Sequence, residues 1–313
     1  MISLCRDLFV DAHDHLPDLF QRLDPNNTGL IDFISWSKLL SPSDLPRLTA
    51  KCRSIGPLSL VTPSNQEIQL LNDMHARAHT IAAEAAHYGT RMLFDAEQTW
   101  FQPAIDNLVL ELQQTYNDKR QTDFPIIFNT YQCYLKDTPK RLMLDVNRSE
   151  RFGYHFGAKL VRGAYINSER RRANELSYAS PIHDTIEETH ECYDGAMLYL
   201  LTHHSSRPNS KLEVMCATHN QSSVEKVIEL MDELQIPSSG STVHFAQLLG
   251  MSDNLSFTLG KHGYSTFKYV PYGKVEEAIP YLLRRAIENR DMLKNNKSEL
   301  QLMRQELGRR VFG

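Results

Sequence analysis

Short apolar runs alternate with longer amphipathic segments along the chain from residue 61 onward. The runs have the length and apolar content of buried strands, whereas the segments between them carry apolar residues at helical spacing. We predict strands over residues 91–97, 126–134, 157–165, 212–220, 243–251 and 266–273. Strands that alternate with helices form parallel βαβ units, so the pattern predicts an α/β fold.

Cap and turn residues locate the helices between these strands. A helix over residues 64–88 ends at Gly89, and its predicted apolar side consists of Ile68, Leu71, Ile81 and Ala85. Thr138 and Pro139 are typical of an N-cap followed by the first helical residue. Further helices are predicted around 108–112, through 201 with a break near 181, over 223–234, from 275 and over 293–307.

Two architectures fit this alternation, a closed barrel and a doubly wound open sheet. No Gly-x-Gly-x-x-Gly turn follows a predicted strand, which counts against the dinucleotide-binding form of the open sheet. The pattern changes near residue 60, so we predict two domains, residues 1–60 and residues 61–313.

The first domain contains a loop with the spacing of an EF-hand. Oxygen-bearing side chains occupy its positions one, three, five and nine: Asp24, Asn26, Thr28 and Asp32. Position twelve is Ser35, where calcium binding requires a bidentate glutamate. We therefore predict a small helical, degenerate EF-hand-like segment and no metal site.

Composition and charge narrow the classes of function. The 313 residues are 41% hydrophobic and 23% charged, with a formal net charge of -4, which indicates a globular chain without a nucleic-acid partner. The five cysteines are scattered without metal spacing, as is typical of a reducing compartment. The N-terminal residues form neither an apolar signal nor an Arg/Ser-rich targeting peptide.

Polar residues close every predicted strand, and in an α/β barrel the chemistry lies at these carboxyl ends. They are Asp95, Gln132, Arg162, Thr218, His219, Asn220, Gln247 and Tyr269. Such amides, hydroxyls and cations suit a large phosphate-bearing organic cofactor, whereas no nucleophile elbow, phosphate loop or metal-ligand set is present in the sequence. The alternative is that these residues are ordinary helix caps and loop starters.

Two segments that carry cationic residues strengthen the hypothesis that the strand ends form a binding site. Lys159 and Arg162 interrupt an apolar strand, and Gly163 beside Arg162 allows the backbone to approach an anion such as a phosphate. The alternative there is an edge strand with solvated cations.

The second cationic segment lies on the last helix before residue 289. Helical spacing puts Tyr281, Arg284, Arg285 and Glu288 on one face, where the two arginines can clamp a carboxylate. The apolar residues of the opposite side, Leu282 among them, are predicted to pack against the rest of the protein. The alternative is an ordinary amphipathic helix with a solvated charged face.

Five motifs, in order, resemble proline dehydrogenase of the eukaryotic mitochondrial type. They are DAEQT (95–99), NTYQCY (129–134), KLVRGAY (159–165), YVPYG (269–273) and YLLRRAIEN (281–289). The resemblance implies a distorted (βα)8 TIM-like barrel that binds FAD without a covalent bond and oxidises L-proline to (S)-1-pyrroline-5-carboxylate. It also implies ubiquinone as the electron acceptor, and a mitochondrial location on the matrix side of the inner membrane with peripheral membrane contact.

The resemblance implies a role for each matched residue. Arg284 and Arg285 bind the substrate carboxylate with Glu288 beside them, Tyr269 packs against the substrate ring, and Tyr165 closes over it. Asp95, Lys159 and Tyr269 are the expected catalytic residues, although bacterial members have an arginine at the position of Lys159. The expected FAD-binding residues are Ala96, Gln132, Arg162, Gly163, Ala164, Thr218, His219, Asn220 and Gln247.

The resemblance leaves two alternatives and one further expectation. A hydroxyproline dehydrogenase shares the scaffold, but a smaller residue than Tyr269 would be needed to accommodate a ring hydroxyl. A non-catalytic scaffold or calcium-responsive protein on a truncated barrel is the other alternative. In the family, a first strand bearing a lysine precedes the EF-like segment, so we expect a barrel that lacks its first strand.

Overall fold

The computed structural model describes residues 62–207, 211–288 and 297–312. It also describes a few single residues nearer the N-terminus: Gln21, Asp24, Thr28, Gly29, Ile34, Pro46 and Leu60. Most of the predicted first domain, including Ser35 of the EF-like loop, therefore lies outside the described residues. Within that loop, the Asp24 carboxylate accepts hydrogen bonds from the backbone N–H groups of Thr28 and Gly29.

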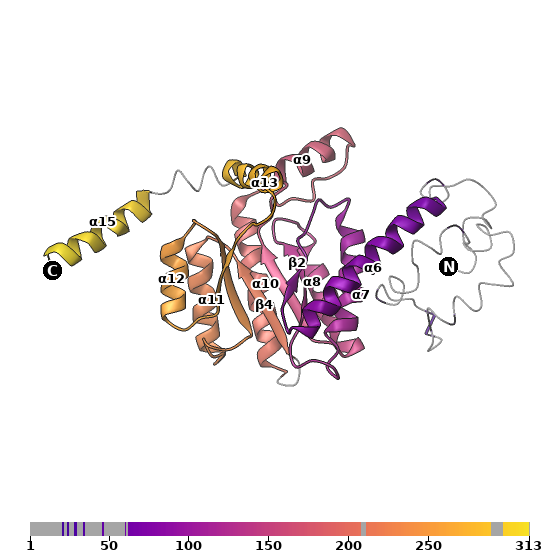
Figure 1. Cartoon of the computed structure of the whole chain (residues 1–313), viewed down its shortest axis with the longest axis horizontal. Helices are drawn as coiled ribbons and strands as arrows, with labels where there is room; N and C mark the ends of the chain where they lie inside the picture. The colour runs from indigo at the N-terminus through magenta and orange to yellow at the C-terminus, as the bar shows by residue number, and fades with distance from the viewer. Residues whose placement is uncertain are drawn as a thin grey trace.

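Strands and helices alternate throughout the main described part (Figure 1). The strands are β1 (Met92–Leu93), β2 (Ile127–Gln132), β3 (Phe156–Val161), β4 (Leu212–Ala217), β5 (Val243–Leu248) and β6 (Thr266–Tyr269). The helices are α6 (Asn65–His87), α7 (Gln102–Tyr116), α8 (Thr138–Phe152), α9 (Ile166–Glu175), α10 (Ile186–Ser205), α11 (Gln221–Glu233), α12 (Asp253–Lys261), α13 (Val275–Glu288) and α15 (Lys297–Phe312).

The six strands form one sheet in chain order, and every neighbouring pair is parallel. The sheet curls, and α7, α8, α10, α11 and α12 follow its curve (Figure 1). These observations confirm the predicted α/β fold and all six predicted strands. The paired parts are shorter than predicted: Asp95, Arg162, Thr218, His219 and Asn220 lie in the loops that follow the strands, whereas Gln132, Gln247 and Tyr269 are paired within them.

The main core lies between β2–β5 and the helices α8, α10 and α11. Tyr131, Phe156, Leu160, Tyr193 and Val214 are buried within it. Gly157 of β3 is also required for this packing, since a Cβ there would lie 2.6 Å from the Ile127 carbonyl oxygen. A smaller core joins α6, α7 and the start of β2.

Local details of three helices differ from the prediction. Ile81 of α6 is 57% exposed, whereas Ala78 and Ala82 are buried in the smaller core, where their small side chains allow a close approach of neighbouring elements. Thr138 is the first residue of α8, and its hydroxyl donates to the Gln132 carbonyl oxygen (2.6 Å) instead of capping the helix. Leu282 of α13 is 45% exposed, because among the described residues its side of the helix is not covered.

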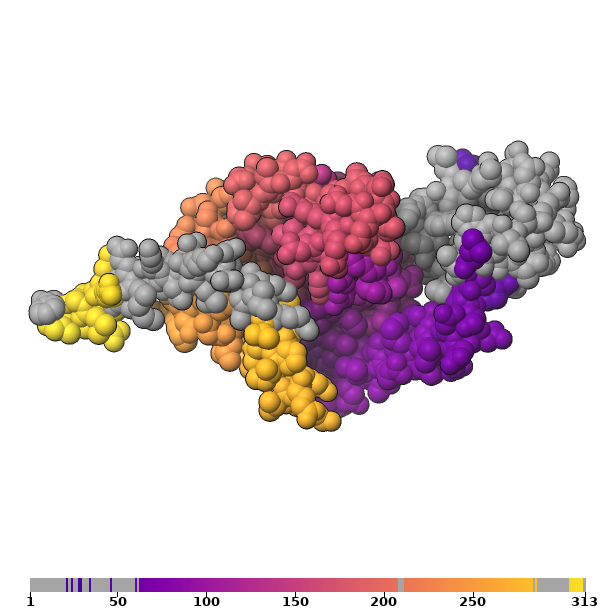
Figure 2. Space-filling model, turned by 90° about the horizontal axis from the view of Figure 1, so that it is seen from above, coloured from indigo at the N-terminus to yellow at the C-terminus, as the bar shows by residue number. Residues whose placement is uncertain are grey.

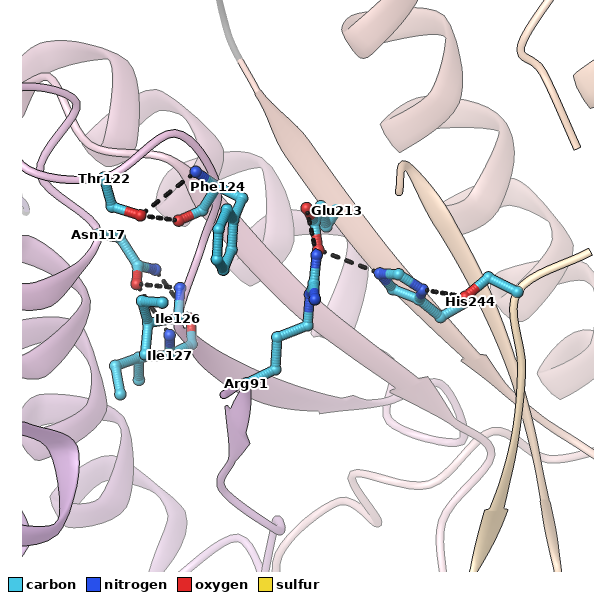
Figure 3. A network of polar contacts seen from close by, with 9 residues as sticks. Arg91, Asn117, Thr122, Phe124, Ile126, Ile127, Glu213 and His244 are labelled. Carbon is cyan, nitrogen blue, oxygen red and sulfur yellow. Dashed lines mark hydrogen bonds and ion pairs between the residues drawn. The ribbon is translucent and has the colours of Figure 1, made fainter. Parts of the chain in front are cut away.

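Asn117, directly after α7, forms hydrogen bonds with the backbone at the start of β2 (Figure 3). Its side-chain oxygen accepts from the backbone N–H groups of Ile126 and Ile127, each at 2.8 Å. Its amide group donates to the Ile127 and His155 carbonyl oxygens at 2.8 and 3.1 Å. A fully buried asparagine thereby satisfies backbone groups that the strand ladder leaves unpaired.

An ion pair crosses the inside of the curled sheet near the amino ends of the strands (Figure 3). Arg91, before β1, donates from Nε and Nη2 to the two carboxylate oxygens of Glu213 in β4, at 2.6 and 2.9 Å. Its guanidinium also lies 4.8 Å from the ring centre of Phe124. The polar chain continues through His244 of β5, 3.0 Å from Glu213, to the Ser265 hydroxyl at 2.8 Å.

The electrostatics of Glu213 follow from this environment. Burial raises the pKa of the carboxyl group, but the hydrogen bonds from His244 and Arg91 outweigh burial, and the pKa lies below its ordinary value. The ionised form is therefore favoured in the folded chain. Its stabilising contribution is present above the ordinary pKa of 4.5 and is lost as the pH falls below that value.

We expect Arg91→Met to lower the free energy of unfolding by about 3 kcal/mol, because Glu213 is then left buried without its cation. Adding Glu213→Leu should cost less than the sum of the two single changes. Arg171→Met, in an exposed pair with Glu175, is the matched control and should cost less than about 0.5 kcal/mol. Chemical denaturation measures the free energy of unfolding of the three single variants, Glu213→Leu included, and of the double variant. Equal effects of Arg91→Met and Arg171→Met would contradict a stabilising role of the Arg91–Glu213 pair.

Candidate active site

The polar residues predicted at the strand ends lie along one edge of the sheet. Parallel strands in chain order bring their carboxyl ends together, so the residues that follow β2, β3, β4 and β6 line the same edge. Helices α9 and α13 lie at this end of the molecule (Figure 1). Figure 2 views the protein from above this end and shows α9 and α13 on different sides of it.

Arg162, directly after β3, is held by side chains of three other segments. Its Nε donates to His190 Nδ1 (2.9 Å), Nη1 to Thr218 Oγ1 (2.6 Å) and Nη2 to Ser223 Oγ (2.8 Å). The guanidinium also stacks 4.5 Å over the ring centre of Tyr193. Because arginine is always protonated, His190 must accept at Nδ1, and burial together with Arg162 lowers the pKa of His190.

The same network reaches the amino end of α11. Asn220 is the N-cap, and its side-chain oxygen accepts from the Ser223 N–H at 3.0 Å. Ser223 donates through its hydroxyl to Asp194 (2.6 Å), which also pairs with Lys226 at 2.6 Å. Asp194 balances the charge of Lys226, so Arg162 and the positive end of the helix are the groups of this network that favour an anionic ligand.

The segment between β1 and α7 lies across the ends of β2 and β3. Lys159 of β3 pairs with Asp95, with the lysine mostly buried (13% exposed) and the carboxylate 63% exposed. Gln132 donates from Nε2 to the Glu97 carbonyl oxygen at 2.7 Å. These contacts bring Asp95, Lys159 and Gln132 together, as expected of one site. The half-buried Ala96 lies between Asp95 and Glu97, the two residues that make these contacts.

His219 and Gln247 make contacts with residues near the start of α12. His219 Nδ1 lies 3.1 Å from the Ser252 hydroxyl, and burial followed by Lys268 lowers the pKa of His219 to about 4. Gln247 donates to the Thr218 carbonyl oxygen (3.2 Å) and accepts from Ser256 (2.8 Å). Gln247 is buried, so it contacts neighbouring protein groups instead of forming an exposed surface.

Aromatic and cationic groups meet where β6 leads to α13. The rings of Tyr269 and Tyr281 lie 5.9 Å apart, and the Arg285 guanidinium lies 5.3 Å over the Tyr281 ring. Arg284 and Glu288 belong to the same helix, but their side chains lie outside the described residues. Burial raises the pKa of Tyr281, so this hydroxyl stays neutral.

The remaining predicted residues lie in the turn between β3 and α9. Gly163 has φ +129°, and a Cβ there would lie 2.5 Å from the Tyr134 ring. Ala164 follows it, and Tyr165 is the N-cap residue of α9. Only glycine allows this sharp turn against Tyr134.

Several polar partners in this network are not at strand ends and were not predicted from the sequence. They are His190, Asp194, Ser223, Lys226, Ser252 and Ser256. Asn220 with Ser223 three residues later is a recognisable capping pattern, but nothing in the sequence indicates the partner of His190 or Asp194. In the described part of the chain, no group of three or more His, Cys, Asp or Glu residues is placed to bind a metal, and no helix is long and apolar enough to span a membrane.

Comparison with known sequences identifies close relatives. A sequence model of the proline dehydrogenase family matches residues 30–298. The mitochondrial proline dehydrogenase 1 of Homo sapiens is 42% identical over 309 residues, which cover 97% of this chain and 50% of that protein. A hydroxyproline dehydrogenase of Bos taurus is 37% identical and covers 94% of this chain and 67% of that protein. The chain spans about half the length of the human protein.

Comparison with solved structures supports the fold. Proline utilization A (PutA) of Bdellovibrio bacteriovorus superposes with a TM-score of 0.62 at 22% sequence identity. The match covers 70% of this chain and 22% of that chain.

We expect Arg162→Lys to lower the free energy of unfolding by about 2 kcal/mol, since an ammonium group cannot replace three directed bonds and the stacking on Tyr193. Arg309→Lys, an exposed ion-pair position on α15, is the control and should change stability by less than about 0.5 kcal/mol. Thermal and denaturant unfolding measure both. A change at Arg162 as small as that at Arg309 would show that the network contributes little to stability.

Proposed function

Because this chain belongs to the proline dehydrogenase family, we propose that it carries out the flavin-dependent oxidation of L-proline at the carboxyl edge of its sheet. The meeting of Tyr269, Tyr281 and Arg285 carries the proposal. Two aromatic rings beside a guanidinium suit a small apolar ring that bears a carboxylate. The similarity to the human mitochondrial proline dehydrogenase supports the choice of substrate.

The donor groups along this edge fit FAD. Arg162 and the amino end of α11 offer a cation and backbone N–H groups of the kind that bind a pyrophosphate. Gln132 offers an amide group at the end of β2 for the pyrimidine edge of the flavin. The other expected contacts are Ala96, Gly163, Ala164, Thr218, His219 and Asn220. Gln247, also expected at the cofactor site, is buried behind Thr218 and would act by holding its backbone. When bound, the flavin would supply the hydride acceptor.

In this proposal the protein mainly positions the substrate. Arg284 and Arg285 bind its carboxylate with Glu288 beside them, and Tyr269 packs against its ring. Tyr165 closes the site from the start of α9, while the Lys159–Asp95 pair fixes the side near β1 and β3. Orientation of this kind lowers the barrier by removing rotational freedom before the carbon next to nitrogen loses its hydride.

The product would be (S)-1-pyrroline-5-carboxylate, and we propose ubiquinone as the final electron acceptor. Relatives from Homo sapiens and Caenorhabditis elegans carry mitochondrial names, which supports a mitochondrial location. The matrix side of the inner membrane is part of our proposal. Contact with the membrane would be peripheral.

The visible spectrum of the purified chain tests this function. We expect the absorption bands of oxidised flavin, and we expect L-proline to bleach them without oxygen. A protein without flavin would support the scaffold alternative, and a flavoprotein that proline does not reduce would contradict the proposed substrate.

Arg285→Met should raise the KM for L-proline about tenfold or more, since a charge-assisted hydrogen bond to a carboxylate contributes about 1.5–3 kcal/mol. Arg284→Met is expected to act in the same direction, with flavin content little changed in both variants. Arg304→Met, at an exposed position of α15, is the control and should leave KM unchanged. A wild-type KM in Arg285→Met would remove this residue from the carboxylate site.

A second candidate substrate is trans-4-hydroxyproline, because a hydroxyproline dehydrogenase is among the relatives. The large side chain of Tyr269 favours proline, so we expect a higher kcat/KM for L-proline. Tyr269→Ser should narrow the difference by making room for a ring hydroxyl. An unchanged ratio of the two kcat/KM values would show that Tyr269 does not control selectivity.

A further inference from the structure

A carboxylate on α9 binds the segment that carries Asp95. Glu169 is fully buried, and both of its carboxylate oxygens accept hydrogen bonds from Thr99. The Thr99 backbone N–H donates to Oε1 at 2.6 Å, and the Thr99 hydroxyl donates to Oε2 at 2.8 Å. The two residues are 70 positions apart in the chain, so this contact joins the β1–α7 segment to α9.

Burial of a carboxylate is costly, so the local surroundings must offset it. Glu169 lies in the first turn of α9, where the helix dipole favours negative charge. The charge-assisted bonds from Thr99 add to this stabilisation. An apolar side chain would give simple packing at a lower desolvation cost, whereas the carboxylate accepts only correctly placed donors and therefore fixes a specific arrangement.

A second contact links the same two segments. The Arg172 guanidinium lies 4.6 Å over the ring centre of Trp100, the residue after Thr99. Arg172 follows Glu169 by three positions, so both side chains project from the same face of α9. Contacts at two successive positions fix the orientation of the segment as well as its distance from the helix.

The linked segments both lead to residues of the proposed site. Asp95, four residues before Thr99, pairs with Lys159. Glu97 lies between Asp95 and Thr99 in the chain, and its carbonyl oxygen accepts a hydrogen bond from Gln132. On the other side, the Glu169 backbone N–H donates to the Tyr165 carbonyl oxygen at 3.0 Å in the first turn of α9. A shift of the Thr99 contact would therefore displace the segment of Asp95 relative to that of Tyr165.

We propose that Glu169 is a positioning residue, which by binding Thr99 holds the Asp95 segment against α9 and so sets the geometry in which L-proline binds. This role rests on the proposed function. Glu169 is not expected to touch the substrate, so its loss should affect the KM for L-proline more than kcat.

Trp100 provides a readout that needs no turnover. The chain has two tryptophans, so Trp36→Phe leaves Trp100 as the only one. In this background we expect Glu169→Ala to shift Trp100 emission to longer wavelength, because the ring loses its place beneath Arg172 and gains solvent. Glu175→Ala, an exposed glutamate of the same helix, is the matched control and should change neither emission nor KM.

The kinetic test uses Glu169→Ala, Glu169→Gln, Thr99→Ala and Thr99→Ser. We expect Glu169→Ala to raise the KM for L-proline about tenfold with a smaller change in kcat. Glu169→Gln should recover much of this loss, since its amide can accept from the Thr99 N–H and donate to the Thr99 hydroxyl oxygen. Thr99→Ser should resemble wild type, and Thr99→Ala should add little to Glu169→Ala.

Four outcomes separate the two proposals. An active wild type with an unchanged KM in Glu169→Ala would overturn the positioning role, as would unchanged Trp100 emission. A loss of folding stability that Glu169→Gln does not relieve, with equal falls in kcat and kcat/KM, would also overturn it. A wild type that holds no flavin and does not oxidise proline would instead count against the proposed function, whatever the fluorescence shows.

Discussion

The ion pair between Arg91 and Glu213 joins the first and fourth strands of the sheet across its curled inner side. Two strands separate β1 from β4 in the sheet, so these side chains can meet only if the sheet curls around them. His244 and Ser265 extend the contact toward β6, and together the four residues connect the amino ends of distant strands. The curl in turn makes the carboxyl ends converge, which places residues from separate parts of the chain at one edge.

Most of the fold could be predicted from the sequence because strand and helix periodicities are local. The six strands, the break near Pro181 and the family were all identified correctly. Helix α12 was missed, since it has nine residues and its N-cap, Ser252, makes no side-chain capping bond. On α6 the prediction was wrong for Ile81, which is exposed, whereas Ala85 packs against the smaller core as expected. Ala78 and Ala82 are the buried residues of this helix, and periodicity alone favours larger residues such as Ile81.

The site could be predicted only in part, for a related physical reason. Strand ends in a parallel sheet are brought together by topology alone, so Gln132, Arg162 and Thr218 could be grouped from sequence. Partners on helices, such as His190 and Glu169, depend on how each helix rotates against the sheet. Their contacts span 28 and 70 positions, and no local pattern specifies that rotation.

The short length of β1 has a consequence for local stability. Only Met92 and Leu93 pair with β2, so the backbone ladder holds the following segment weakly. Hydrogen bonds from side chains mainly hold this segment. Thr130 donates to the Phe94 carbonyl oxygen, and Gln132 donates to the Glu97 carbonyl oxygen. In native-state hydrogen exchange, this segment would therefore form a separate cooperative unit that opens at lower free energy than β2–β5. The contacts of Asp95 with Lys159 and of Thr99 with Glu169 would then open together with this unit, while the rest of the sheet stays folded.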